Sequence, residues 1–323
     1  TGIISFSPKT WPVNEAMLIR MRDTMFHRGP DGAGTWMSNN SAIGFGHRRL
    51  AIVDLSEAAS QPMSLPDESL SIVFNGEIYN HGEIRQELIE LGYTNWKTDH
   101  SDTEVILYSF QEWGIDCVKR FRGMFAIAIW DARTKKLWLV RDRVGIKPLY
   151  YASDERGLVF ASEIKAILAG PERKCAVNEE AFFHYLSFLT TPAPMTLFEG
   201  IDKLAAGTWL CVSSDGTIKV ERWWDALDDI EPILGKGDNE IAGEILCGLE
   251  EAVNYRKVGD VPIGVFLSGG VDSSVNLALF SKGNNEPVKT FSIGYDGNQD
   301  SVADELPYAR IMAEHVGADH HEY

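Results

Sequence analysis

The first residue of the chain, Thr1, carries two groups that could do chemistry together. Its side-chain hydroxyl can act as a nucleophile, and its own α-amine, which titrates near neutrality, can take the proton. Gly2 and a strand-like apolar run follow. The pattern alone is a weak signal, because every chain has a first residue and threonine survives removal of an initiator methionine. It indicates a catalytic N-terminus only in company with other residues.

A glycine-rich loop, SGGVDSS at residues 268–274, is the second candidate. Backbone N–H groups of such a loop, at the start of a helix, favour a bound phosphate. The loop is not a Walker loop, because the GxxxxGKS or GxxxxGKT pattern is missing. The alternative is an ordinary strand-to-helix turn. The residues predicted to hold a phosphate-bearing cofactor are Leu267, Ser268, Gly269, Gly270, Asp272, Ser273 and Ile293, and Asp272 is also the predicted Mg²⁺ ligand.

Strands and a few helices are expected to position the first candidate, within residues 1–225. Asn14 is predicted to cap a helix whose apolar residues repeat at helical spacing. Ser101 and Glu104 match a capping box that opens a helix ending at Trp113. A further amphipathic helix is expected at 83–91. The expected strands are 70–74, 124–130, 137–141, 149–151 and 158–161, with 124–130 and 137–141 joined as a hairpin.

Alternating strands and helices are expected to position the glycine loop. Residues 226–240 are rich in Asp, Gly and Pro and are interpreted as a linker. Beyond them, at 241–323, helices are expected at 241–255, 272–281 and 305–316, with strands at 261–267 and 288–294 and a third starting near the end. This alternation predicts a parallel sheet and an α/β domain.

Composition restricts the class of protein. The net charge of −17 argues against nucleic acid or an anionic membrane surface as the main partner. The four cysteines contain no CxxC pair, which favours buried thiols in a reducing cytosol. No stretch approaches the ~18 apolar residues of a membrane helix, and a signal peptide is not expected. We therefore expect a cytoplasmic protein of two domains that does not bind membranes.

Six motifs occur in one order: HRGPD at 27–31, GHRRLAIVDL at 46–55, FNGEIYNH at 74–81, SDTE at 101–104, RDRVGIKPLYY at 141–151, and the SGGVDSS loop. In this order the chain resembles the glutamine-dependent asparagine synthetases over nearly its whole length. The resemblance implies a class II N-terminal-nucleophile glutaminase domain with an αββα sandwich. It also implies that the first part of an ATP-pyrophosphatase domain follows.

The resemblance implies a pocket for L-glutamine. Arg49 would bind the α-carboxylate through its planar fork, with the backbone from Leu50 to Val53 lining the site. Without the resemblance, Arg49 would read as a surface salt bridge. Glu77 and Asp102 would hold the α-ammonium, although an acid in the first turn of a helix, as Asp102 is, also favours the helix dipole.

The same resemblance assigns catalysis to Thr1, Asn75 and Gly76. The side-chain amide of Asn75 and the backbone N–H of Gly76 would form an oxyanion hole. By local pattern alone, the run Asn75-Gly76-Glu77 is expected to be a polar turn that ends the strand at 70–74. His27 and His81 are assigned no chemistry.

Thr1 departs from the family, whose glutaminases carry cysteine there. A thiol is more acidic and more nucleophilic than a hydroxyl. Three explanations are open: an engineered substitution that traps glutamine, a natural threonine nucleophile, and a retired glutaminase. Because the other pocket residues are kept, we expect a pocket that binds glutamine and hydrolyses it slowly if at all.

The resulting prediction is an amidotransferase that uses ATP, Mg²⁺ and glutamine. Ammonia from glutamine would pass through a channel to an acyl-adenylate of aspartate or another carboxylic acid, and a homodimer is compatible with this activity. One rival is a β-lactam-synthetase-like enzyme without glutaminase activity. The other is a non-catalytic glutamine-binding or scaffold protein.

Overall fold

The computed structural model describes residues 1–323 except 174, 229, 285 and 295–304. It divides into two compact units, Thr1–Ile230 and Glu231–Tyr323, each considered by itself. The predicted bounds 1–225, 226–240 and 241–323 stay predictions, and position 229 of the predicted linker lies outside the described residues. Among the described residues, none of the helices combines the length and apolar composition that a membrane crossing requires.

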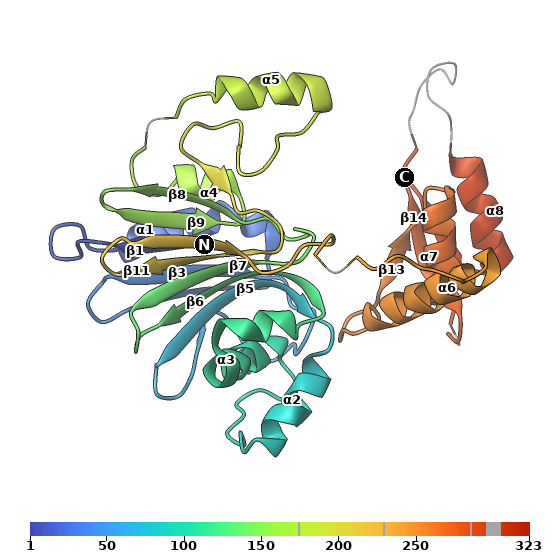
Figure 1. Cartoon of the computed structure of the whole chain (residues 1–323), viewed down its shortest axis with the longest axis horizontal. Coiled ribbons are helices and arrows are strands. Elements are labelled where there is room, and N and C mark those ends of the chain that lie inside the picture. Colours follow the sequence, from blue (N-terminus) through green and yellow to red (C-terminus); the bar gives the residue numbers. More distant parts are fainter. Residues whose placement is uncertain (174, 229, 285, 295–304) are drawn as a thin grey trace. The chain divides into compact units, whose positions relative to one another are not determined.

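Two antiparallel sheets form the centre of the first unit (Figure 1). The first sheet has the order β10 (Asp202–Lys203), β8 (Tyr150–Asp154), β9 (Gly157–Ala161), β1 (Gly2–Ser5), β3 (Ile43–Arg49), β2 (Gly32–Met37). The second has the order β12 (Ile218–Arg222), β11 (Thr208–Ser213), β7 (Lys136–Arg141), β6 (Gly123–Asp131), β5 (Leu70–Ile78), β4 (Met63–Ser64).

Helices cover the outer face of each sheet. Helices α1 (Glu15–Asp23) and α4 (Ile164–Leu168) pack on the first sheet, and α3 (Asp102–Trp113) packs on the second beside α2 (His81–Glu90). Figure 1 shows this sequence of helix, sheet, sheet and helix layers. The remaining helices of this unit are α5 (Glu179–Phe188) and the short 3₁₀ turns η1 (Phe26–Arg28), η2 (Glu57–Ala59) and η3 (Gly114–Lys119). The predicted α+β sandwich is therefore confirmed.

Three apolar cores hold these layers together. The core between the sheets includes Phe45 and Phe160 from the first sheet and Ala128 and Leu139 from the second, all buried. A second core lies between the second sheet and helices α2 and α3, and a third lies between the first sheet and helices α1 and α4. Both faces of each sheet are covered, so its central strands are apolar throughout, as in the run FAIAIW of β6.

The expected strand at 70–74 is longer than predicted, and the prediction that Asn75-Gly76-Glu77 forms a turn is wrong. Strand β5 continues to Ile78, because residues 75–77 pair with Ala126, Phe125 and Met124 of β6. A Cβ on Gly76 would lie 2.0 Å from the carbonyl oxygen of Met124, so only glycine fits this approach.

The predicted capping box is also wrong. Ser101 precedes α3, but its side chain makes no cap hydrogen bond. The carboxylate of Glu104 instead accepts hydrogen bonds from the backbone N–H groups of Lys97 and Thr98, both at 2.8 Å. The backbone just before the helix thus uses the acceptor that a capping box would need. The cap at Asn14 is confirmed, because its side chain accepts from Met17 N at the start of α1.

The second unit contains the predicted parallel sheet. Its order is β13 (Gly264–Phe266), β14 (Lys289–Ser292), β15 (Asp319–Glu322), and both pairings are parallel. Its helices are α6 (Asp238–Tyr255), α7 (Val271–Ser281) and α8 (Leu306–Val316). Helix α6 begins inside the segment predicted to be a linker. A small core of Leu267, Leu277, Val288, Ala309 and Ala313 holds the unit together.

Candidate functional site

One cavity of about 230 Å³ opens in the first unit, beside the first residue of the chain. All the residues predicted for glutamine recognition and catalysis line it: Thr1, Arg49, Leu50, Val53, Asn75, Gly76, Glu77 and Asp102. They come from segments up to about a hundred positions apart, and the fold brings them together.

The sheet fixes Thr1 at the start of β1. Its α-amine donates to the carbonyl oxygen of Gly46 at 2.9 Å, and Gly46 N donates back to Thr1 O at 2.9 Å. The Thr1 hydroxyl donates to the carbonyl oxygen of Phe160 at 2.8 Å. Burial lowers the pKa of the α-amine from 8.0 to about 5. The amine is therefore neutral at neutral pH, and a neutral amine can accept a proton.

His47, which sequence reasoning missed, also lines the cavity. Burial and the nearby α-amine lower its pKa to about 3, so the imidazole is neutral at physiological pH. Its Nε2 lies 3.2 Å from the carbonyl oxygen of Phe74, while its buried Nδ1 has no hydrogen-bond partner among the described residues. The motif GHRRL contains this histidine, but the motif alone does not say which way the ring faces.

The end of β5 presents hydrogen-bond donors to the cavity. Phe74 N donates to the side chain of Gln61, and Ile78 N donates to the carboxylate of Asp102, so neither N–H points at β6. Backbone direction alternates along a strand, and the N–H of Gly76 therefore points to the same side as these two. The side-chain amide of Asn75 donates to the hydroxyl of Ser162 at 3.2 Å, another contact that sequence reasoning missed.

Two carboxylates, those of Glu77 and Asp102, also line the cavity. Burial raises the pKa of Asp102 to about 7, and the charge of nearby Glu77 adds to this, while the hydrogen bond from Ile78 N opposes it. Burial also raises the pKa of half-buried Glu77, against the attraction of the Lys147 ammonium. The pair can therefore hold a cation, which would stabilise both ionised forms.

The guanidinium of Arg49 is held by backbone oxygens. Its Nη1 donates to Ser56 O at 2.8 Å, and its Nη2 donates to Asp54 O. The reading of Arg49 as a surface salt bridge has no support in these contacts. Leu50, which follows it, is exposed at the mouth of the cavity.

The glycine loop of the second unit connects β13 to α7. A hydrogen bond between the hydroxyls of Ser268 and Ser273, 3.0 Å apart, holds its conformation. Gly270 N also donates to Ser268 Oγ at 3.3 Å. Gly269 has φ of +81°, and a Cβ there would lie 2.6 Å from Ala309 N. Ser273 and Asp272 lie in the first turn of α7.

The flanking positions differ in exposure. Leu267 is buried in the core of the second unit, so only its backbone could face a ligand. Ile293 follows β14 and is exposed. Across the described ranges, His, Cys, Asp and Glu do not gather in threes or more that could hold a metal ion.

Comparison with known proteins gives two family matches. The model of the glutamine amidotransferase domain matches residues 1–224, and that of asparagine synthase matches residues 244–323. Asparagine synthetase (glutamine-hydrolyzing) 3 of Bacillus subtilis strain 168 is 35% identical over 336 residues, which cover 100% of this chain and 53% of that protein. Amidase chry2 of Gibberella zeae is 33% identical over 316 residues, which cover 93% of this chain and 45% of that protein.

The chain spans about half the length of these curated relatives. Among solved structures, the allosteric regulatory enzyme of purine biosynthesis aligns with a TM-score of 0.51 and 14% identity, over 99% of this chain and 79% of that one. This likeness concerns the fold.

Proposed function

Because this chain belongs to the glutamine amidotransferase family, among its asparagine-synthetase-like members, we propose that it takes nitrogen from glutamine and transfers it to a carboxylic acid at the expense of ATP. The observation that carries the proposal is the shared cavity beside Thr1. It is lined by the first residue of the chain, by Asn75 and Gly76, by the arginine Arg49, and by the two acids Glu77 and Asp102, which are the groups that the proposed reaction needs.

Glutamine has complementary groups for this arrangement. We propose that its α-carboxylate meets Arg49, its α-ammonium meets Glu77 and Asp102, and its amide carbon faces Thr1. Contacts with the α-carboxylate and the α-ammonium would then fix the direction of the ligand's side chain, which places its amide carbon for attack. A guanidinium and a pair of acids in the same cavity support this orientation, because an amino acid carries both opposite charges on one carbon.

The cleavage step uses groups of this chain alone. In a chain that begins at Thr1, the hydroxyl oxygen attacks the amide carbon while the neutral α-amine takes the hydroxyl proton. The oxyanion accepts hydrogen bonds from the Asn75 side chain and Gly76 N. The protonated amine then returns its proton to the leaving nitrogen, ammonia departs, and water cleaves the glutamyl ester. The hydroxyl must first leave the carbonyl oxygen of Phe160.

The glycine loop fits a phosphate-bearing substrate in part. Backbone N–H groups around Gly269 and Gly270, with the hydroxyls of Ser268 and Ser273, would hold phosphate oxygens at the start of α7. Asp272 would share a Mg²⁺ ion with those oxygens, since among the described residues no group of three or more His, Cys, Asp and Glu could hold the ion alone. ATP supplies the energy to activate the carboxyl group of the acceptor as an acyl-adenylate.

The acceptor is proposed as aspartate or a related carboxylic acid. The asparagine synthetase relative supports aspartate, and the amidase relative supports another acid. Mass-spectrometric analysis of products from an assay with ATP, glutamine and a panel of carboxylic acids would decide between them.

Replacement of Thr1 tests the glutaminase part of the proposal. We expect the unchanged chain to bind glutamine with little turnover, and Thr1→Cys to raise glutamate release by orders of magnitude, since thiolate is the better nucleophile. One extra residue before Cys in that variant is the matched control. It blocks the α-amine and should remove the gain. A folded but inactive Thr1→Cys variant would contradict the proposal and favour the β-lactam-synthetase-like rival.

A further inference from the structure

The loop between β3 and η2 contains a residue that the proposed mechanism does not use. Asp54 is buried, with 2% of its surface exposed, and it has φ of +51°. A left-handed backbone is unfavourable for residues with a Cβ, and aspartate adopts it more readily than most. In this conformation the carbonyl oxygen of Asp54 accepts a hydrogen bond from Arg49 Nη2.

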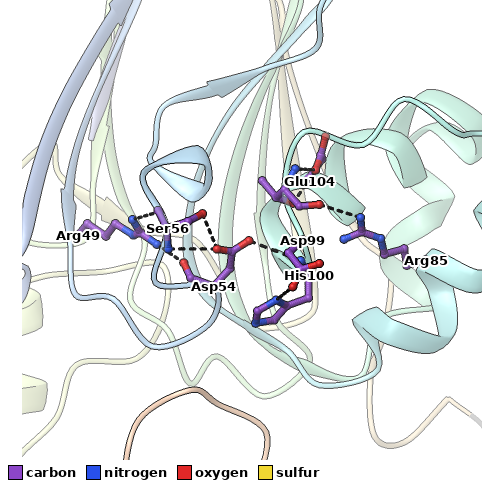
Figure 2. Close-up of polar contacts among 8 residues, drawn as sticks. Arg49, Asp54, Ser56, Arg85, Asp99, His100 and Glu104 are labelled. Carbon is purple, nitrogen blue, oxygen red and sulfur yellow. Dashed lines mark hydrogen bonds and ion pairs between the residues drawn. The ribbon is translucent and has the colours of Figure 1, made fainter.

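The side chain of Asp54 holds the second acceptor of Arg49 in place. Its Oδ1 accepts from Ser56 Oγ at 2.6 Å and from Ser56 N at 3.1 Å (Figure 2). The carbonyl oxygen of Ser56 in turn accepts from Arg49 Nη1. Both oxygens that bind the guanidinium thus depend on one aspartate, one through its backbone and the other through its carboxylate.

A weaker contact joins the same carboxylate to the loop that precedes α3. Oδ2 of Asp54 lies 3.5 Å from the backbone nitrogen of His100, two residues before Asp102 (Figure 2). Burial alone would raise the pKa of the Asp54 carboxyl, but the hydrogen bonds from Ser56 and His100 hold it below its usual value. The carboxylate is therefore ionised wherever the protein is folded near neutral pH.

We propose that Asp54 is a positioning residue for Arg49: it turns the fork toward the α-carboxylate of the bound amino acid without touching the ligand. The inference rests on the proposed function, because it needs a ligand with a carboxylate at Arg49. The physical reason is preorganisation: the Arg49 side chain, already held by two carbonyl oxygens, loses less conformational freedom when the ligand binds.

The test compares two ligands that differ only at the carboxylate. L-Glutamine carries the α-carboxylate, and 4-aminobutanamide keeps the amine and the amide without it. For Asp54→Asn we expect glutamine affinity to fall about tenfold, the order expected when a charge-assisted fork loses its support. Affinity for 4-aminobutanamide should change less than twofold. NMR titration of the full chain registers both ligands, including the weaker one.

Three further variants sharpen the result. Asp131→Asn is the matched control, because Asp131 is also buried and accepts hydrogen bonds from its own turn at Arg133 and Thr134, away from the cavity. It should bind both ligands as the unchanged chain does. In an Arg49→Lys background, Asp54→Asn should reduce the affinity for glutamine little further, since the two residues act on the ligand together. Ser56→Ala should reduce the affinity for glutamine by less than Asp54→Asn does and again leave the affinity for 4-aminobutanamide nearly unchanged. This variant keeps the test valid if Asp54→Asn does not fold.

The outcomes separate the inference from its premise. Asp54→Asn could weaken the binding of both ligands equally, or its effect on glutamine affinity could add fully to that of Arg49→Lys. Either result would overturn the positioning role and leave Asp54 as a purely structural residue. Unchanged glutamine affinity in Asp54→Asn would overturn it as well. If the unchanged chain binds no glutamine, the proposed function fails instead.

Discussion

The charge state of Asp102 should make the proposed glutamine binding depend on pH. Burial and the nearby charge of Glu77 raise its pKa to about 7. A bound ammonium favours the ionised form, so binding must expel a proton from any chain in which Asp102 is protonated. We expect glutamine affinity to rise as pH increases from about 5 to 7 and to level off above that pKa.

Calorimetry in buffers of different ionisation enthalpy measures this proton release. Near pH 6 the observed binding enthalpy should depend on the buffer, with the sign of proton release. In Asp102→Asn the affinity should be lower and its dependence on pH should be much weaker. Binding without proton release at pH 6 would mean that the ammonium of the ligand lies elsewhere.

At the scale of elements, the second unit offers a matched pair of glycines. Gly269 and Gly283 have φ of +81° and +79°, but a Cβ meets close atoms only at Gly269. Gly283→Ala should lower the free energy of unfolding by about 1–2 kcal/mol, the cost of a left-handed backbone. Gly269→Ala should cost clearly more, because the backbone of α8 at Tyr308 and Ala309 cannot yield easily. Urea unfolding followed by circular dichroism compares the two, and equal costs would show that the loop moves away from α8.

The elements also show what the sequence could predict and what it could not. The hairpin β6–β7, the parallel sheet and the cap at Asn14 follow from local patterns, and the structure confirms them. The fate of residues 75–77 does not, because Asn-Gly is locally a turn signal and only the distant partner β6 makes it strand. The capping-box prediction for Glu104 failed for a different reason: its carboxylate accepts hydrogen bonds from Lys97 N and Thr98 N, in the loop just before the helix, and not from the cap residue.

The candidate site was predicted through motifs and not through geometry. The recognised residues line one cavity, but their catalytic and binding roles stay predictions. Asp54, His47 and Ser162 were missed because their function depends on what their side chains meet in the fold. A signal was present for Asp54, which lies within GHRRLAIVDL, but that motif gives no reason to separate it from its neighbours.

At the scale of the whole molecule, the two units differ in the size of their cores. Within the part of the chain that the structure describes, the first has three apolar clusters, and the second has one small cluster with two alanines among its five buried members. We therefore expect two calorimetric transitions, with the second unit melting first. Leu277→Ala should lower the free energy of unfolding of the second unit alone, by about 2–5 kcal/mol, and so shift only the earlier transition. Leu158→Ala should do the same to the first unit and shift only the later transition, since both leucines are fully buried.

Ligands should act on the same two transitions separately. Glutamine at about 100 times its dissociation constant should stabilise the first unit by roughly 2.7 kcal/mol and leave the other unit unchanged. MgATP should shift the earlier transition. A single transition that both leucine variants lower equally would show that the units unfold as one.

The pairing of β5 with β6 has a consequence for how the cavity can be observed. Asn75 and Glu77 direct their N–H groups into the ladder, whereas Gly76 directs its own toward the cavity. Within one continuous strand, a protected amide, an unprotected amide and a protected amide thus follow each other. The N–H of Gly76 should therefore exchange with deuterated solvent more slowly when a bound ligand places an oxygen atom against it. Its exchange rate reports the occupancy of the site at a single backbone nitrogen, without a label on the ligand.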